Sequence, residues 1–127
     1  EYLARFGKTW KVLRGGSFPL DEAKDLERAE RTYARGLNPA GVGRQLRAIL
    51  ASGDRKDRLK SVKAPTLVIH GTIDPLVKMA AGKDTAASIP GAKLLLIEGM
   101  GHALPIPMWS TIVSAIAEHA HGVTETH

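Results

Sequence analysis

The sequence predicts an α/β fold built on a parallel strand–helix–strand unit. Two short runs, "TLVIH" at 66–70 and "KLLLI" at 93–97, are apolar without polar alternation, which is typical of strands covered on both faces. An alanine-rich helical stretch at 79–88 separates them. In that order the two strands are expected to be parallel, with a right-handed crossover. The loops that follow the strands then emerge at one edge of the sheet.

The N-terminal half is predicted to be mainly helical after a short extended segment. Residues 9–13, "TWKVL", favour a short strand or an irregular edge, because the breaker cluster "RGGSFP" follows them. A helix over 21–36 begins with Asp21 as its N-cap. An Asn-Pro pair begins a second helix over 38–53, and the residues at 54–64 are predicted to form a charged linker.

The C-terminal helix has the clearest helical pattern. From Trp109 to Ala120 the apolar residues recur at i, i+3, i+4, i+7, i+8 and i+11, which gives one continuous stripe. A stripe of this kind predicts that Trp109 lies in the core. The second helix carries a similar apolar face, made by four residues: Val42, Leu46, Ile49 and Leu50.

Length and composition indicate one domain and argue against several classes of partner. A chain of 127 residues with 43% hydrophobic residues can form one core of modest size. Its net charge of +5 comes from scattered basic residues without interleaved aromatic ones, so we expect no nucleic-acid partner. No apolar stretch reaches the roughly 18 residues of a membrane span, and we expect no membrane partner. The lack of cysteine suits a reducing compartment, which favours a cytoplasmic protein.

A carboxylate and an imidazole stand in the two loops that follow the apolar runs. Asp74 lies in "GTIDP" and His102 lies in "GMGHALP". One interpretation is turn chemistry for the aspartate and a surface position for the histidine. The other is a partnership, in which Asp74 accepts the imidazole Nδ1 proton while Nε2 of His102 takes a proton from a nucleophile. The spacing alone leaves both interpretations open.

The wider motifs resemble the C-terminal part of the α/β-hydrolase family, especially its methylesterase and enol-lactonase-like esterases. The resemblance rests on "APTLVIHGTIDPLV", "IPGAKLLLIEGMGHALP" and the amphipathic C-terminal helix. In that family the acid follows a strand in a G-x-x-D-P loop, matched here by Gly71, Asp74 and Pro75. The histidine stands in G-M-G-H-x-L-P, matched by residues 99–105. The resemblance implies that Asp74 is the triad acid and that His102 is the general base.

The resemblance also implies an architecture. It predicts a partial α/β-hydrolase fold, in which a parallel βαβ unit has flanking helices and the remnant of a helical cap. We expect a single domain over 1–127, with a cap-like segment at 1–37 and the C-terminal part of the hydrolase core at 38–127.

The nucleophile is the part of the family pattern that this chain lacks. The family's G-x-S-x-G motif does not occur in the sequence, and neither does the oxyanion loop that the family carries near its N-terminus. Ser17 is the candidate nucleophile within the chain, because it precedes a helix and keeps the order Ser, Asp, His. Pro19 stands where the second glycine of the motif belongs, and a serine of a turn is the alternative for Ser17.

The remaining histidines are expected to have structural positions. His70 ends the first apolar run and is predicted to be a hydrogen-bonded residue near the Asp74 loop. His119 and His121 are two residues apart on a helix and point in different directions, which makes a poor metal pair. No metal or organic cofactor is implied.

The expected function is a hydrolase of carboxylic esters or lactones that uses the Ser-His-Asp mechanism, with this chain supplying the acid and the histidine. The alternative is a non-catalytic remnant of a hydrolase that self-associates and acts as a binding module. Two strands leave an unpaired edge. We therefore expect either an upstream segment, since the sequence starts at Glu1 rather than at methionine, or a homo-oligomer joined across the strand at 66–70.

Overall fold

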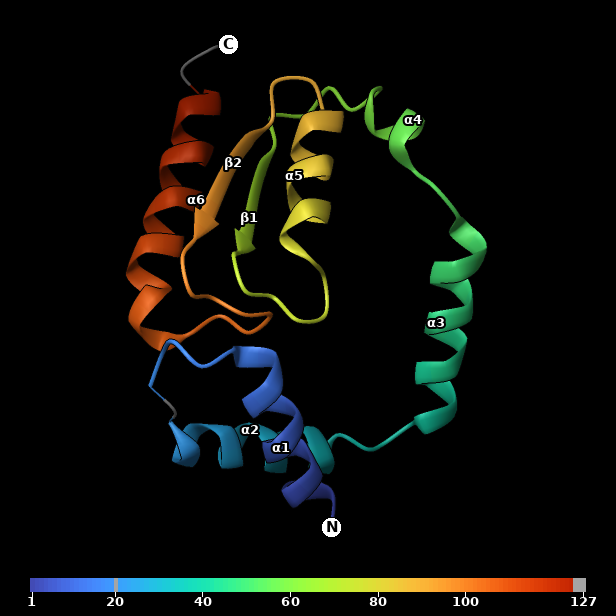
Figure 1. Ribbon diagram of the computed structural model, residues 1–127, viewed down its shortest axis with the longest axis vertical. Helices are drawn as coiled ribbons and strands as arrows, with labels where there is room; N and C mark the ends of the chain where they lie inside the picture. Colours follow the sequence, from blue (N-terminus) through green and yellow to red (C-terminus); the bar gives the residue numbers. More distant parts are fainter. Residues whose placement is uncertain (20, 125–127) are drawn as a thin grey trace.

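The computed structural model describes residues 1–19 and 21–124 (Figure 1). Six α-helices, two strands and one 3₁₀ turn occur in the described residues, in this order: α1 (Tyr2–Arg14), α2 (Glu22–Ala34), α3 (Pro39–Ser52), α4 (Lys56–Leu59), β1 (Leu67–Gly71), α5 (Met79–Ser88), β2 (Lys93–Ile97), η1 (Ile106–Met108) and α6 (Trp109–Thr124).

The predicted parallel strand–helix–strand unit is confirmed. Strand β1 pairs with β2 in parallel, and the register runs from Leu67 opposite Lys93 to Gly71 opposite Ile97. Helices α5 and α6 lie on either side of the two strands (Figure 1). The strands are half-buried rather than fully covered, because one pair of strands with one helix on each side leaves much of both faces open.

The prediction of a strand at 9–13 is wrong, because these residues lie within α1. Three aromatic residues at i, i+4 spacing, Tyr2, Phe6 and Trp10, stack along one side of this helix. The ring centroids of Tyr2 and Tyr33, which belongs to α2, are 5.3 Å apart. Tyr2 and Phe6 lie before residues 9–13, so the five residues that favoured a strand do not contain the i, i+4 spacing of the helix.

The two predicted helix starts in the N-terminal half are confirmed. The side chain of Asp21 accepts a hydrogen bond from the Lys24 amide at 3.0 Å, and the side chain of Asn38 accepts one from the Gly41 amide at 2.9 Å. The predicted linker at 54–64 is wrong in part, since it contains the short helix α4.

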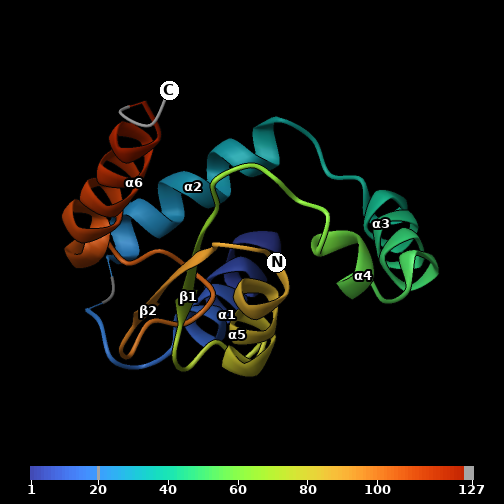
Figure 2. The ribbon, with the colours of Figure 1, turned by 90° about the horizontal axis from the view of Figure 1, so that it is seen from above.

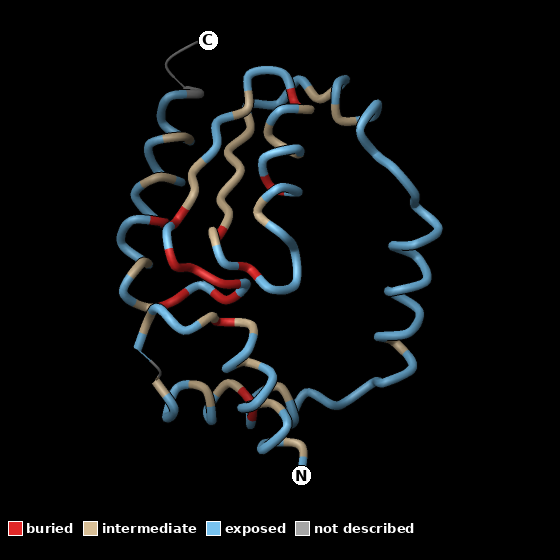
Figure 3. The backbone as a smooth tube through the Cα atoms, in the orientation of Figure 1, coloured by how far each residue is buried: buried red, intermediate tan, exposed pale blue. Residues whose placement is uncertain are grey.

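Buried residues gather where the two strand ends meet the end of α1 (Figure 3). The core cluster consists of Ile97, Met100 and Ile112, with partly buried side chains packed around it. Trp109 is 47% exposed, so its predicted place in the core is wrong; its indole N–H donates to the carbonyl of Leu104 at 3.2 Å. Within 1–19 and 21–124, no helix is both long and apolar enough to cross a membrane.

Candidate active site

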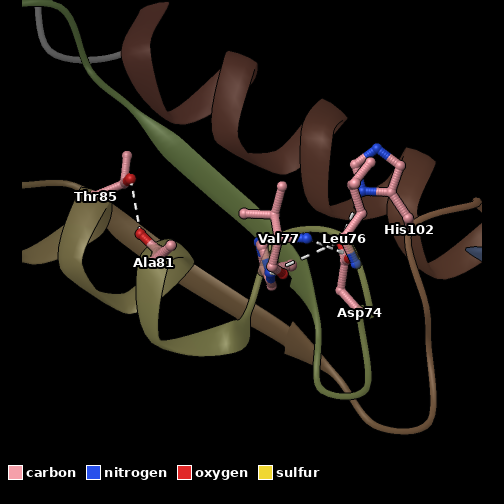
Figure 4. A network of polar contacts seen from close by, with 7 residues as sticks. Asp74, Leu76, Val77, Ala81, Thr85 and His102 are labelled. Atoms are coloured by element: carbon pink, nitrogen blue, oxygen red, sulfur yellow. Dashed lines mark hydrogen bonds and ion pairs between the residues drawn. The ribbon is translucent and has the colours of Figure 1, made fainter. Parts of the chain in front are cut away.

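Asp74 lies in the turn that directly follows β1, and one of its carboxylate oxygens shapes that turn. Oδ1 accepts the amide N–H groups of Leu76 at 2.8 Å and of Val77 at 2.9 Å (Figure 4). This is the local bonding by which aspartate stabilises a tight turn. Oδ1 of Asp74 therefore has the turn-forming role that one of the two interpretations gave to this residue.

The second carboxylate oxygen of Asp74 faces His102, which lies in the loop after β2. Oδ2 accepts a hydrogen bond from Nδ1–H of His102 at 2.8 Å (Figure 4). The proton lies on Nδ1, because an ionised carboxylate can only accept. The expected contact between the two side chains is present, since the carboxyl ends of adjacent parallel strands bring both loops to one edge.

The two members of this pair differ in exposure. The Asp74 side chain is 5% exposed, whereas that of His102 is 38% exposed. Burial raises the pKa of the Asp74 carboxyl, but hydrogen bonds from Val77, His102 and Leu76 outweigh it and hold the pKa below its usual value. Nε2 of His102 has no hydrogen-bond partner in the described part of the chain. The pair thus consists of a buried carboxylate and a partly exposed imidazole whose Nδ1 is bonded to that carboxylate.

His70 contacts the same turn through a hydrogen bond, as expected of a structural histidine. Its Nε2–H donates to the carbonyl of Val77 at 2.9 Å, and the same nitrogen lies 3.9 Å from Oδ2 of Asp74. The ring occupies space that Gly82 of α5 leaves free, because a Cβ there would lie 2.6 Å from the imidazole. His70 therefore supports the segment that supplies two amide donors to Asp74.

The loop that carries His102 is held by the C-terminal end of α1. The amide of Gly101 donates to the Arg14 carbonyl at 3.1 Å, and the amide of His102 donates to the Leu13 carbonyl at 2.6 Å. The approach is close enough that a Cβ at position 101 would lie 2.3 Å from the Leu13 oxygen. Sequence reasoning missed these residues because it placed 9–13 in a strand.

Ser17 packs beside this loop without contacting the histidine ring through a hydrogen bond. A Cβ added at Gly99 would lie 2.9 Å from Oγ of Ser17. The Ser17 side chain is exposed, and no hydrogen bond joins its hydroxyl to His102 in the described structure. The structure brings Asp74 and His102 together and places Ser17 against the adjoining backbone.

A cavity of about 640 Å³ lies between α2 and the residues at 103–107. Its lining combines apolar groups with charged ones, among them Arg14, Asp25 and Arg28. Neither Asp74 nor His102 lines it. Across 1–19 and 21–124, no group of three or more His, Asp or Glu side chains is arranged to hold a metal ion.

Comparison with known proteins places the chain in a protein family. Residues 48–119 match the sequence profile of the TAP-like protein family. The rhodomycin D methylesterase DnrP of Streptomyces peucetius is 30% identical over 126 residues, which are 98% of this chain and 42% of that protein. The chain therefore spans less than half the length of this curated relative.

Solved structures resemble the fold over nearly the whole chain. The meta-cleavage product hydrolase CumD from Pseudomonas fluorescens IP01 superimposes with a TM-score of 0.71 at 18% identity, over 95% of this chain and 46% of that one. Est816, described as an N-acyl homoserine lactone degrading enzyme, gives a TM-score of 0.56 at 25% identity, over 96% of this chain and 47% of that one.

Proposed function

Because this chain belongs to the TAP-like family of α/β-hydrolases, we propose that it supplies the acid and the base of an enzyme that hydrolyses carboxylic esters or lactones. The fold is a partial α/β-hydrolase fold, as the sequence resemblance implied. The proposal is carried by one observation: Nδ1–H of His102 donates to Oδ2 of Asp74 at 2.8 Å.

In the proposed reaction His102 acts as general base and then as general acid. With its Nδ1 proton held by Asp74, the imidazole presents the Nε2 lone pair, which accepts the proton of a serine hydroxyl as the serine oxygen attacks the ester carbonyl carbon. The imidazolium then protonates the leaving alkoxide, and the alcohol departs. Water attacks the acyl-serine ester by the same route, which releases the carboxylic acid and regenerates the serine. Asp74 stabilises the imidazolium in both steps.

We propose that the nucleophilic serine and the oxyanion donors come from polypeptide outside these 127 residues. The chain has no G-x-S-x-G motif and spans 42% of the length of the methylesterase DnrP. Ser17 is the candidate within the chain. Its hydroxyl would have to turn from Gly99 toward His102, because the two side chains are not hydrogen-bonded in this structure.

The proposed substrate class is supported by the relatives and by the pair itself. DnrP is a methylesterase by name, and Est816 is described as degrading a lactone. Both substrates carry an ester carbonyl, which is attacked by one nucleophile and needs one proton returned to the leaving oxygen. A single histidine can serve both proton transfers when its Nδ1 is bonded to a carboxylate.

The test is a chimera in which this chain replaces the matching segment of DnrP, compared with the chain alone. Each protein is incubated with p-nitrophenyl butyrate, and serine labelling by a fluorophosphonate is located by mass spectrometry. We expect the chimera to turn over, and His102→Ala to lower its kcat/KM by about 10⁶-fold. His119→Ala on α6 is the matched control and should leave the rate unchanged.

The location of the label decides between the two nucleophiles. Labelling in the DnrP portion supports an external serine, whereas labelling of the chain alone at Ser17 supports the internal candidate. A folded chimera that neither turns over nor takes up label would contradict the proposal and would favour the non-catalytic binding module.

A further inference from the structure

A second buried charge besides Asp74 lies at the end of α1 and has no part in the proposed reaction. Arg14 is 6% exposed, and Nη2 of its guanidinium donates to both carboxylate oxygens of Asp25 in α2. A buried charge must be paired, because removing a single partner leaves the other charge buried and uncompensated. The ion pair therefore fixes the end of α1 against α2.

The backbone of the same turn of α1 holds the histidine loop. The last carbonyls of a helix have no partners within the helix. Here the carbonyl of Leu13 accepts the His102 amide and the carbonyl of Arg14 accepts the Gly101 amide. The main chain of His102 thus takes its position from the end of α1 as well as from β2.

The same end of α1 also touches the loop that carries Asp74. Gly15 ends the helix with a φ of 76°, and a Cβ there would lie 2.6 Å from Cδ1 of Ile73, the residue before Asp74. One helix terminus therefore meets both loops of the site. A small movement of that terminus would change the distance between the two functional side chains.

We propose that Arg14 and Asp25 are positioning residues, whose ion pair aligns His102 with Asp74 by fixing the C-terminal turn of α1. The guanidinium contacts α2 through its side chain, while its own carbonyl contacts the histidine loop. Arg14 thereby connects α2, through its side chain, with the histidine loop, through its main chain. That loop carries the imidazole whose Nδ1 lies 2.8 Å from Oδ2 of Asp74. The catalytic importance of this alignment rests on the proposed function, whereas the alignment itself does not.

The test uses nuclear magnetic resonance on the 127-residue chain. The two readouts are the titration of the Asp74 carboxyl carbon and the hydrogen-exchange rates of the Gly101 and His102 amides. We expect Asp25→Ala to raise exchange at both amides by tenfold or more. It should also raise the pKa of Asp74, because the bond from His102 is one of the interactions that lower that pKa. The conservative Arg14→Lys variant should restore part of both readouts relative to Arg14→Ala.

The matched control is Glu27→Ala, on the same helix as Asp25. Glu27 pairs with Arg31 at 3.8 Å, and both side chains are more than 60% exposed. An exposed ion pair contributes little to the stability of the fold. This variant should therefore leave the amide exchange rates and the Asp74 titration unchanged.

A double variant, Arg14→Met with Asp25→Leu, separates positioning from mere stability. Apolar replacement of both partners removes the buried charges together and is expected to retain the fold, as seen by circular dichroism. The proposal expects the Asp74 titration to shift in this folded variant. If the titration and the amide exchange stay as in the unaltered chain, or if folded Asp25→Asn also leaves them unmoved, the proposal is overturned. Neither readout needs hydrolysis, so this result is independent of whether the chain takes part in ester cleavage.

Discussion

Asp74 divides two tasks between its two carboxylate oxygens. Oδ1 accepts the amides of Leu76 and Val77, and Oδ2 accepts the proton of His102. An asparagine at this position could still form the turn through its carbonyl oxygen, but its amide group is a donor. The turn alone therefore does not require aspartate, whereas the contact with a protonated Nδ1 does.

This division predicts the effect of Asp74→Asn. The turn should persist, while the new amide would donate to Nδ1 and move the imidazole proton to Nε2, the wrong tautomer for a base. In the DnrP chimera we expect kcat to fall by about 10⁴-fold with little change in KM. Steady-state kinetics measures this effect, and circular dichroism checks the fold. A kcat within tenfold of the unaltered chimera would argue against Asp74 as the orienting acid.

The lowered pKa of Asp74 predicts how stability depends on pH. A carboxyl whose folded pKa lies below its unfolded value of about 3.9 stabilises the fold above that value. The contribution is lost as the pH falls through the folded pKa. Urea unfolding from about pH 7 down to about pH 2.5 should therefore show the stability gap between the chain and Asp74→Asn shrinking below about pH 4. A gap that stays constant over this range would contradict the role assigned to the ionised carboxylate.

At the scale of elements, the sequence predicts those helices and strands whose pattern lies in neighbouring residues. Helix α5 and both strands lie where their composition and their flanking breakers predict them, and the parallel strands bring the loops of Asp74 and His102 to one edge of the sheet. Helices α1 and α4 could not be predicted in this way. Helix α1 has aromatic contacts that reach α2, and α4 is a four-residue helix that packs against α5. Both depend on partners distant in the sequence.

The support of the histidine loop by α1 could not be predicted for the same reason. It requires Gly101, whose role as a spacer becomes visible only when the end of α1 lies against it. The glycines of "GMGH" permit a tight loop, in which Gly99 has a φ of 72°. The lack of a side chain at Gly101 also lets the end of α1 approach the loop, so that the carbonyls of α1 accept hydrogen bonds from the loop amides.

Gly101→Ala should accordingly disrupt the site by forcing the loop that carries His102 away from the end of α1. The added methyl would lie 2.3 Å from the Leu13 carbonyl oxygen and 2.4 Å from the carbonyl of Arg14, both of them backbone atoms. We expect a loss of stability of about 1–3 kcal/mol, measured by urea denaturation. Gly7→Ala within α1 is the control, because nothing lies within 4 Å of its added Cβ; it should be neutral or stabilising by up to about 1 kcal/mol. Equal stabilities for the two variants would contradict the close packing described here.

At the scale of the whole molecule, the chain leaves large apolar faces uncovered. Figure 2 shows α3 at one side, apart from the pair of strands and from α6. All four apolar residues that share a face of α3 are more than half exposed: Val42, Leu46, Ile49 and Leu50. On α6, Val113 and Ile116 are exposed as well, so the stripe predicted for that helix buries chiefly Ile112. Faces of this size mark contact surfaces in soluble proteins.

These faces, together with the outer edges of a two-stranded sheet, predict that the isolated chain associates with itself. Each Leu or Ile removed from water contributes up to about 1.5–3 kcal/mol, and burying several of them together opposes the loss of translational and rotational freedom on association. Sedimentation equilibrium at micromolar concentration should give a mass above the 13.6 kDa of one chain. Ile49→Glu should weaken the association by tenfold or more if α3 takes part, whereas Glu118→Gln on the exposed side of α6 should not. A stable monomer would contradict the expected homo-oligomer, and in the DnrP chimera the added polypeptide should abolish the association by covering the same faces.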